Sequence, residues 1–555
     1  MDKNSARIVK SASAFLAVLI IVVAIVLINQ KLKVDERREA ALRETINCNE
    51  AYDARLQDFV TFADEKFAAR CMEVEKRESD YNTCLMGSYG AAHISMWNID
   101  ALNGGEYPTF FGYPIVYAQY LYKTPMELKD YLSNIVQSDN TINHVYVNID
   151  PYILSQNYTE ATFYDEQPQS FEEYIHNEIL QLFSDYPNIS FELFLPARPV
   201  SYWATLPVEE YAEIMEEWYV FLMYLHWCPN VKVRYLGDQE WLVANDYNYA
   251  TPERFTDAVM NKAYMYLYAY EQYEITPPEL KLKKGIIDKY IRKLKNGDYD
   301  ICDLVGKKIL FLGDSLFDYI SLDSASVPGV VKRMSGAECY NLGITGTQAS
   351  AADPYGFTRI ANALAMKSVV DYNPESRYKR EAERFLADYS DGDSLLFVVL
   401  YGLNDYSAGV PLTEKYIVPV TDTTSSEDDG EEASKPYEYS PEETFEYSVK
   451  YGIEMLRNAY PQAEVMLVSP YPPEGNKGGK EPYFEGGQPL TKYVNMIETI
   501  SDMEKTFYYD MYNSGLITSA NRSEYIADGT HTNEKGAFLV GESITRQIAE
   551  RAFLE

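Results

Sequence analysis

Four short motifs in the second half of the chain carry side chains that are suited to acyl chemistry. In chain order they are GDSL (313–316), NLGITG (341–346), GLND (402–405) and DGTH (528–531). A serine hydroxyl becomes a useful nucleophile only when a neighbouring base takes its proton. His531 is the one histidine after residue 300 and is therefore the candidate base for Ser315.

The same motifs offer groups that could orient the base and stabilise a developing negative charge. Asp528 lies three residues before His531, on a predicted loop into the last helix, where its carboxylate could hold the imidazole tautomer. The backbone amides of Ser315 and Gly346 and the side-chain amide of Asn404 could form a three-donor oxyanion hole. Each such donor can contribute roughly 3–4 kcal/mol of transition-state stabilisation.

The segments that lead into these motifs have the pattern of buried strands. They are KKILFLG (307–313), ECYNLG (338–343), SLLFVVLYG (394–402) and AEVMLVSP (463–470). Nearly continuous apolar runs are typical of parallel strands that are covered on both faces. Helical stretches separate the runs, so a doubly wound α/β sheet is expected. Three of the four motifs directly follow strands, where ligand sites of open α/β sheets lie.

With four motifs in order, residues 305–555 resemble the SGNH hydrolase family, also called GDSL esterases or lipases. The resemblance rests on FLGDSLFD around Ser315, on Gly346, on Asn404 and on the pair Asp528-x-x-His531. It implies a flavodoxin-like three-layer α/β/α fold and the hydrolysis or transfer of an acyl ester, with Ser315 as nucleophile. The alternatives are a helix cap at Ser315 with a surface histidine, or a folded but inactive domain.

Residues 81–278 are expected to form another α/β domain. The segments HVYVNI (144–149), ISFELFL (189–195) and VKVRYL (231–236) have the pattern of buried strands, and residues 209–225 that of an amphipathic helix. Trp203, Trp218, Trp227 and Trp241 are expected in its core rather than on a sugar-binding platform. Pro277-Pro278 is expected to break the chain before a helical linker (279–304) that contains a basic helix at 281–297.

This first domain shows a looser resemblance to a degenerate SGNH-like domain of membrane-anchored proteins linked to surface polysaccharides. The resemblance rests on LFLPARPVSYW (193–203) and on NYATPERF (248–255), in which Thr251 replaces the expected aspartate and Arg254 the expected histidine. Gly87-Ser88 would be the remnant of the serine motif. Such a domain lacks a base for its serine. The alternative is an unrelated α/β domain.

The N-terminal residues predict a membrane anchor. Residues 11–29 contain no charge, and about 20 apolar residues span the hydrocarbon layer of a bilayer. A cleaved signal peptide is the rival interpretation, but the run ends in NQKLK instead of small residues. We expect residues 1–10 to form a cytoplasmic tail, with everything after the anchor exported. Residues 30–80 predict a charged helical stalk, through which a dimer could form, or a helix packed on the next domain.

Composition narrows the range of partners. The chain has 84 acidic and 49 basic residues and a formal net charge of −35, which argues against nucleic-acid binding. Its six cysteines lack zinc-site spacing, so we expect no metal and no cofactor. The acidic segment 421–435 predicts a disordered surface loop.

Together these features predict a membrane-anchored, exported serine esterase. The expected substrates are acylated cell-surface or cell-wall glycans, on which the domain would be an O-deacylase or an O-acetyltransferase. One alternative is a lipase or lysophospholipase that acts on membrane lipids with the same residues. The other is a glycan-binding or assembly module without catalytic activity.

Overall fold

The computed structural model describes residues 143–156, 170–251, 273–374, 376–413 and 440–553, and shorter pieces at 83–87, 117–121, 128–130, 132–133, 254–256, 259, 263, 415–416 and 437–438. The chain divides into two compact units, and all of the described residues belong to the second. The predicted tail, anchor (11–29), stalk (30–80) and acidic loop (421–435) lie outside these residues. No helix among the described residues is long and apolar enough to cross a bilayer.

The first domain is built on a parallel five-stranded sheet. Its strands lie in the order β2-β1-β3-β4-β5. Their bounds are β1 (Thr83–Gly87), β2 (Tyr117–Leu121), β3 (His144–Asn148), β4 (Ser190–Phe194) and β5 (Val231–Arg234). The sequence predicted β3, β4 and β5 but not the first two strands.

Helices and one short hairpin accompany this sheet. The predicted helix at 209–225 is α8 (Val208–Leu225), which buries Trp218 and Phe221. Trp203 and Trp241 are also buried as expected, whereas Trp227 is 80% exposed, which corrects the prediction for that residue. The other elements are α4 (Pro151–Gln156), α5 (Phe171–Tyr174), α6 (Gln181–Asp185), α7 (Val200–Thr205), α9 (Glu240–Val243), β6 (Tyr249–Thr251) and β7 (Arg254–Phe255).

The basic linker helix begins earlier than the sequence predicted. Helix α11 spans Pro277–Asn296, so the two prolines open the helix instead of breaking the chain before it. Proline is accepted in the first turn because the backbone N–H that it lacks has no intrahelical partner there. Thr276 caps the helix together with Glu279, whose carboxylate accepts from the Thr276 backbone N–H at 2.7 Å.

The second domain contains a parallel sheet with strand order β14-β13-β10-β8-β9. The strands are β8 (Lys308–Gly313), β9 (Glu338–Asn341), β10 (Leu395–Leu400), β13 (Glu464–Val468) and β14 (Phe507–Tyr509). The first four match the predicted apolar runs, and every residue of β10 is buried. The short fifth strand was not predicted.

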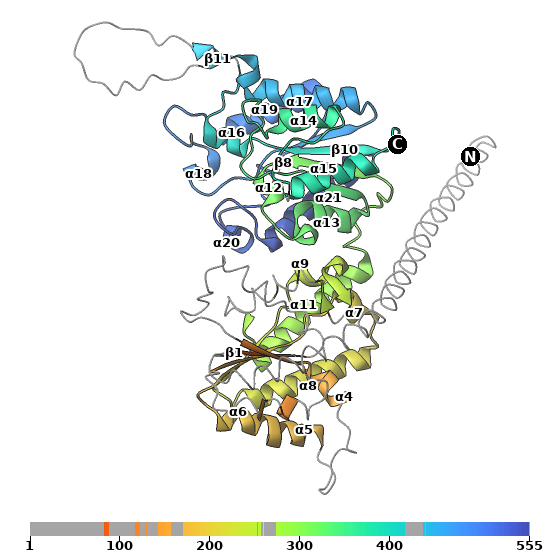
Figure 1. Ribbon diagram of the computed structural model, residues 1–555, viewed down its shortest axis with the longest axis vertical. Helices are drawn as coiled ribbons and strands as arrows, with labels where there is room; N and C mark the ends of the chain where they lie inside the picture. Colours follow the sequence, from red (N-terminus) through yellow and green to blue (C-terminus); the bar gives the residue numbers. More distant parts are fainter. Residues whose placement is uncertain are drawn as a thin grey trace, which may run out of the picture. The chain divides into compact units, whose positions relative to one another are not determined.

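Helices cover both faces of this second sheet. Helices α14, α17 and α19 pack together on one side, and α13 packs with α21 on the other (Figure 1). This is the expected three-layer α/β/α arrangement. The helices are α12 (Ser315–Asp318), α13 (Val327–Ser335), α14 (Phe357–Ala365), α15 (Arg377–Asp388), α16 (Leu403–Ala408), α17 (Phe445–Ala459), α18 (Asn476–Gly479), α19 (Leu490–Glu504), α20 (Arg522–Tyr525) and α21 (Glu534–Arg551). The domain also contains a small antiparallel pair, β11 (Lys415–Tyr416) with β12 (Tyr437–Glu438).

The two sheets share one strand order. In each, the first strand of the domain lies between the second and the third, and the fourth and fifth continue beyond the third. All neighbours in both sheets pair in parallel. In such an open sheet the carboxyl ends of the first and third strands border the crevice where ligands bind. In the second domain these strands are β8 and β10, which lead into GDSL and GLND.

Candidate active site

The candidate nucleophile, Ser315, lies at the junction of β8 and α12. Gly313 ends the strand with little room for a side chain, because a Cβ atom there would lie 2.7 Å from the Phe317 ring. Asp314 then caps α12, with its Oδ1 accepting from the Leu316 N–H at 2.9 Å. Ser315 is the first residue of the helix and is only 4% exposed. The apolar strand and the cap therefore fix the backbone that carries the hydroxyl.

The structure brings Ser315, His531 and Asp528 together as the sequence predicted. The Oγ of Ser315 lies 2.8 Å from Nε2 of His531, and the Nδ1 of His531 lies 2.8 Å from Oδ2 of Asp528. Each separation is that of a hydrogen bond. The hydroxyl can therefore donate to one ring nitrogen while the other donates to the carboxylate, which is the arrangement of a serine-hydrolase triad.

Asp528 is held in its ionised form. Partial burial acts to raise its pKa, but hydrogen bonds from the backbone N–H and the ring of His531 outweigh it and lower the pKa of Asp528 to about 2. Its Oδ1 accepts from the N–H groups of His531 at 2.8 Å and Thr530 at 3.1 Å. A carboxylate in this state can stabilise the imidazolium that forms during catalysis.

The loop that carries Asp528 and His531 is tied down along its length. The backbone of Ile526 pairs with Thr532, and the N–H of Ala527 donates to the carbonyl oxygen of His531 at 2.8 Å. Gly529 adopts a positive φ of 89°, and its carbonyl oxygen accepts from the Glu474 N–H at 3.0 Å. Glycine suits that position because other residues are strained in the left-handed region.

Of the predicted oxyanion donors, Asn404 is engaged within the protein. Its Nδ2 donates to Oδ2 of Asp314 at 3.1 Å and to the carbonyl oxygen of Thr347 at 3.0 Å. An amide group has only two N–H donors. An oxyanion beside Ser315 would therefore share or replace one of these bonds. Both donors are engaged within the protein, and the part of Asn404 in an oxyanion hole stays a prediction.

Gly346 lies in the loop between β9 and α14. Its φ is 82°, and a Cβ atom there would have no heavy atom within 4 Å. The adjacent Thr347 accepts from Asn404, whose other bond reaches Asp314, the residue before the nucleophile. The side-chain amide of Asn404 thus links the third motif both to the first motif and to Thr347, directly after the second motif.

Two buried carboxyl groups beside these loops were not singled out from the sequence. Burial raises the pKa of both Asp314 and Asp405 to about 7. Both oxygens of Asp405 accept from the Ala349 N–H, at 3.0 and 3.1 Å, which ties GLND to the chain just after Gly346. The sequence feature that could have identified them is their position inside the motifs GDSL and GLND.

A backbone pairing in the first domain matches the one on either side of Asp528 and His531. In the first domain Tyr249 of β6 pairs with Phe255 of β7. In the second, Ile526 pairs with Thr532, at the same separation along the chain. Both pairs are antiparallel.

The flanking hydrogen bonds follow the same register. The N–H of Thr256 donates to the carbonyl oxygen of Asn248 at 2.9 Å, and that of Asn533 donates to Tyr525 at 2.9 Å. In each domain the bond joins the residue that follows the second member of the pair to the residue that precedes the first member.

In this common register Thr251 stands at the position of Asp528, and Arg254 at the position of His531. The first domain therefore keeps the backbone pairing without an imidazole at the place of the base. Ser88, the predicted remnant of the serine motif, lies outside the described residues.

No family model matches the chain, and neither does any curated protein. Solved structures do match its C-terminal part. Several of them are named as esterases, and one as a putative lipolytic protein of the G-D-S-L family.

Three of these matches illustrate the likeness, and each covers 99% of the solved chain. An aryl esterase from M. smegmatis is 15% identical over 44% of this chain, with a TM-score of 0.26. A carbohydrate acetylesterase from Sinorhizobium meliloti is 15% identical over 44%, with a TM-score of 0.25. A protein from Desulfitobacterium hafniense assigned to the G-D-S-L lipolytic family is 15% identical over 43%, with a TM-score of 0.27. At these values we draw the function from the geometry of the site.

Proposed function

We propose that residues 305–555 form a serine esterase that acts through an acyl-serine intermediate. The observation that carries this proposal is the continuous hydrogen-bonded chain from Ser315 through His531 to Asp528, with both links at 2.8 Å. Ser315 lies near the start of the domain's sequence, and Asp528 and His531 lie near its end. The three side chains meet beside the loop that contains Gly346. A hydroxyl, an imidazole and an ionised carboxylate in this order are the parts that nucleophilic acyl transfer requires.

In the proposed acylation step, Nε2 of His531 takes the proton of Ser315 as its Oγ attacks the ester carbonyl carbon. The carbonyl oxygen becomes an oxyanion, which the N–H groups of Ser315 and Gly346 and the amide of Asn404 would stabilise. The carbon–oxygen bond to the alcohol then breaks. The imidazolium of His531 gives its proton to the departing alcohol, and an acyl-serine remains.

In the proposed deacylation step, an acceptor hydroxyl attacks the acyl-serine while His531 takes its proton. The tetrahedral intermediate collapses, and the proton returns to Oγ of Ser315. With water as acceptor the product is a carboxylic acid, and with a sugar hydroxyl it is a new ester. The same residues serve both outcomes, so the chain would be a deacylase or an acyltransferase according to the acceptor.

We further propose that the substrate is an acylated glycan of the cell surface or cell wall. The apolar run at 11–29 supports an anchor that would hold the exported domain at the envelope. The side chain of Asp528 is 43% exposed, so the rim of the site on this side is polar and open to water.

A direct test uses the purified full-length chain with p-nitrophenyl acetate, a long-chain p-nitrophenyl ester and a fluorophosphonate probe. We expect cleavage of acetate in preference to the long-chain ester, and covalent labelling of Ser315. Preference for the long chain would replace the glycan proposal with a lipase. Absence of both cleavage and labelling would favour a glycan-binding module and overturn the esterase.

A further inference from the structure

Two residues in the turn that follows Ser315 contact the rest of the proposed site, one at the base and one at the loop that contains Gly346. Helix α12 ends at Asp318, and the next residue, Tyr319, donates its N–H to the carbonyl oxygen of Ser315 at 2.8 Å. These two neighbours send their side chains to different partners. Tyr319 reaches the base, and Asp318 reaches the loop that contains Gly346.

Tyr319 stacks on the catalytic imidazole. The ring centroids of Tyr319 and His531 lie 4.2 Å apart, and the ring planes differ by only 9°. The tyrosine is 43% exposed, so its ring forms an outer wall over the imidazole. Partial burial, followed by the charge of Asp528 and a hydrogen bond to it, raises the pKa of Tyr319 above its usual value. A flat ring held against the imidazole restricts its rotation away from Ser315.

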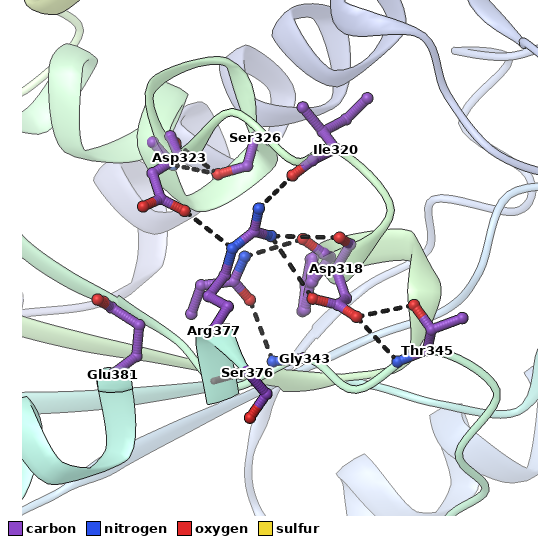
Figure 2. A network of polar contacts seen from close by, with 12 residues as sticks. Asp318, Ile320, Asp323, Ser326, Gly343, Thr345, Ser376, Arg377 and Glu381 are labelled. Carbon is purple, nitrogen blue, oxygen red and sulfur yellow. Dashed lines mark hydrogen bonds and ion pairs between the residues drawn. The ribbon is translucent and has the colours of Figure 1, made fainter. Parts of the chain in front are cut away.

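Asp318 contacts the loop that contains Gly346. Its Oδ2 accepts from the backbone N–H of Thr345 at 3.1 Å and from the Thr345 hydroxyl at 2.7 Å (Figure 2). Thr345 immediately precedes Gly346, whose N–H is a proposed oxyanion donor. Two hydrogen bonds to one carboxylate oxygen therefore fix the peptide next to that donor relative to α12.

Arg377, at the start of α15, holds the turn itself (Figure 2). Its guanidinium donates to the carbonyl oxygen of Asp318 at 3.2 Å and to that of Ile320. It also forms an ion pair with Asp323, with Nε 2.8 Å from Oδ1. The side chain of Arg377 is only 9% exposed, whereas that of its ion-pair partner Asp323 is 63% exposed. A guanidinium that donates to several oxygens holds them at fixed positions relative to one another.

We propose that Asp318 and Tyr319 are positioning residues, through which the turn after the nucleophile aligns the oxyanion loop and the base with Ser315. This inference rests on the proposed esterase function. Neither residue is assigned a bond to the substrate. Tyr319 acts through His531, and Asp318 acts through Thr345 and Gly346. Because catalysis depends on alignment to within about 1 Å, loss of either contact should lower the rate of the chemical step.

The test compares Tyr319→Leu and Tyr319→Phe in the full-length chain. Kcat and KM for p-nitrophenyl acetate and the second-order rate of fluorophosphonate labelling are measured for each. We expect Tyr319→Leu to lower kcat and the labelling rate about 10-fold with little change in KM, and Tyr319→Phe, which keeps the stacked ring, to retain most of both. Tyr451→Leu is the matched control. It removes a different stacked pair, in which Tyr447 and Tyr451 lie 5.4 Å apart on α17, and should leave both rates unchanged.

Asp318 is tested in parallel with Asp318→Ala and Asp318→Asn. The alanine removes both bonds to Thr345, whereas the asparagine keeps an acceptor oxygen. We expect a loss of kcat of about 10-fold or more for alanine and partial rescue by asparagine. Thermal unfolding of every variant is recorded alongside the kinetics.

The inference would be overturned if Tyr319→Leu labelled at the wild-type rate, or if its thermal midpoint fell while kcat did not. Equal loss in Tyr319→Phe and Tyr319→Leu would overturn the role of the stacked ring, because the hydroxyl bonded to Asp528 would then account for the effect. These failures differ from failure of the esterase itself, in which the wild-type protein would not be labelled at Ser315.

Discussion

The side-chain amide of Asn404 donates to the carboxylate of Asp314 at 3.1 Å, so the third motif is bonded directly to the residue that precedes the nucleophile. The same amide donates to the carbonyl oxygen of Thr347, the residue directly after the second motif, at 3.0 Å. One side chain therefore fixes three separate loops around Ser315. This relationship makes Asn404 both a structural link and a candidate donor to the oxyanion.

Asn404→Ala should lower kcat by about 10²-fold to 10³-fold, because it removes one donor to the developing oxyanion. KM should change far less if the amide acts mainly in the transition state. Steady-state kinetics with p-nitrophenyl acetate measure both quantities. A large rise in KM with unchanged kcat would instead assign the amide to substrate binding.

Ser315→Ala and His531→Ala should each reduce kcat by a factor of order 10³ or more, and the double variant should lose little beyond that. The two groups act as a unit, since Oγ and Nε2 already lie 2.8 Å apart. Retained activity in either single variant would refute the assignment. Circular dichroism on each variant checks that the fold is unchanged.

Asp528→Asn should retain the loop but reduce kcat strongly, by up to about 10⁴-fold, because an amide favours the wrong imidazole tautomer. In the wild-type protein the carboxylate of Asp528 accepts from Nδ1 of His531 at 2.8 Å. Asp502→Asn is the control, a similar change in α19 outside the four motifs. Equal loss in both variants would mean that the effect is not local to the triad.

Asp405→Asn should flatten the pH dependence of stability between about pH 4 and pH 7. Burial raises the folded-state pKa of Asp405 from the model-peptide value of 3.8 to about 7, so in this window the folded protein holds a proton that the unfolded chain releases. The free energy of unfolding contributed by this group therefore falls as pH rises through the window. Asp528 acts in the opposite direction but only near pH 2–4, since its pKa is lowered to about 2.

Calorimetry at pH 5 and pH 8 measures this effect. The wild-type midpoint should drop by several degrees more than that of Asp405→Asn over the interval. An equal drop in both proteins would mean that Asp405 is already ionised at pH 5 in the folded state.

A fluorophosphonate probe should label one serine per chain. The first domain shares the strand order of the second, but Arg254 stands where the second domain has His531. With an arginine in that place, we expect the first domain not to activate a serine in the usual way. Mass spectrometry should place all of the label on Ser315, and Ser315→Ala should remove it. Residual label on Ser88 in that variant would show that the first domain is active.

The sequence predicted that Ser315, His531 and Asp528 would lie together because the motifs that carry them are short and can be recognised locally. The Ser315–His531–Asp528 contacts and four strands of the second sheet followed from such local patterns. Strand β14 was missed since Phe507–Tyr509 is too short to show a pattern. The partners of Asn404 were missed because they depend on how distant loops meet.

Tyr319 illustrates the same limit. It adjoins a recognised motif, yet nothing in the local sequence indicates that its ring lies against His531. Pro277 was misjudged for a different reason, because the sequence alone does not separate a proline that ends one segment from a proline that opens a helix. Trp227 was expected inside on the basis of its size and hydrophobicity but lies at the surface.

The nucleophile and its base are 216 residues apart in the chain. During synthesis the serine emerges long before the histidine, and the intervening strands must pair before the two can meet. A growing or partly folded polypeptide therefore carries an inert alcohol at position 315. If residues 305–555 are the proposed esterase, acyl cleavage begins only once the whole domain has closed, and catalytic competence would itself report that folding is complete.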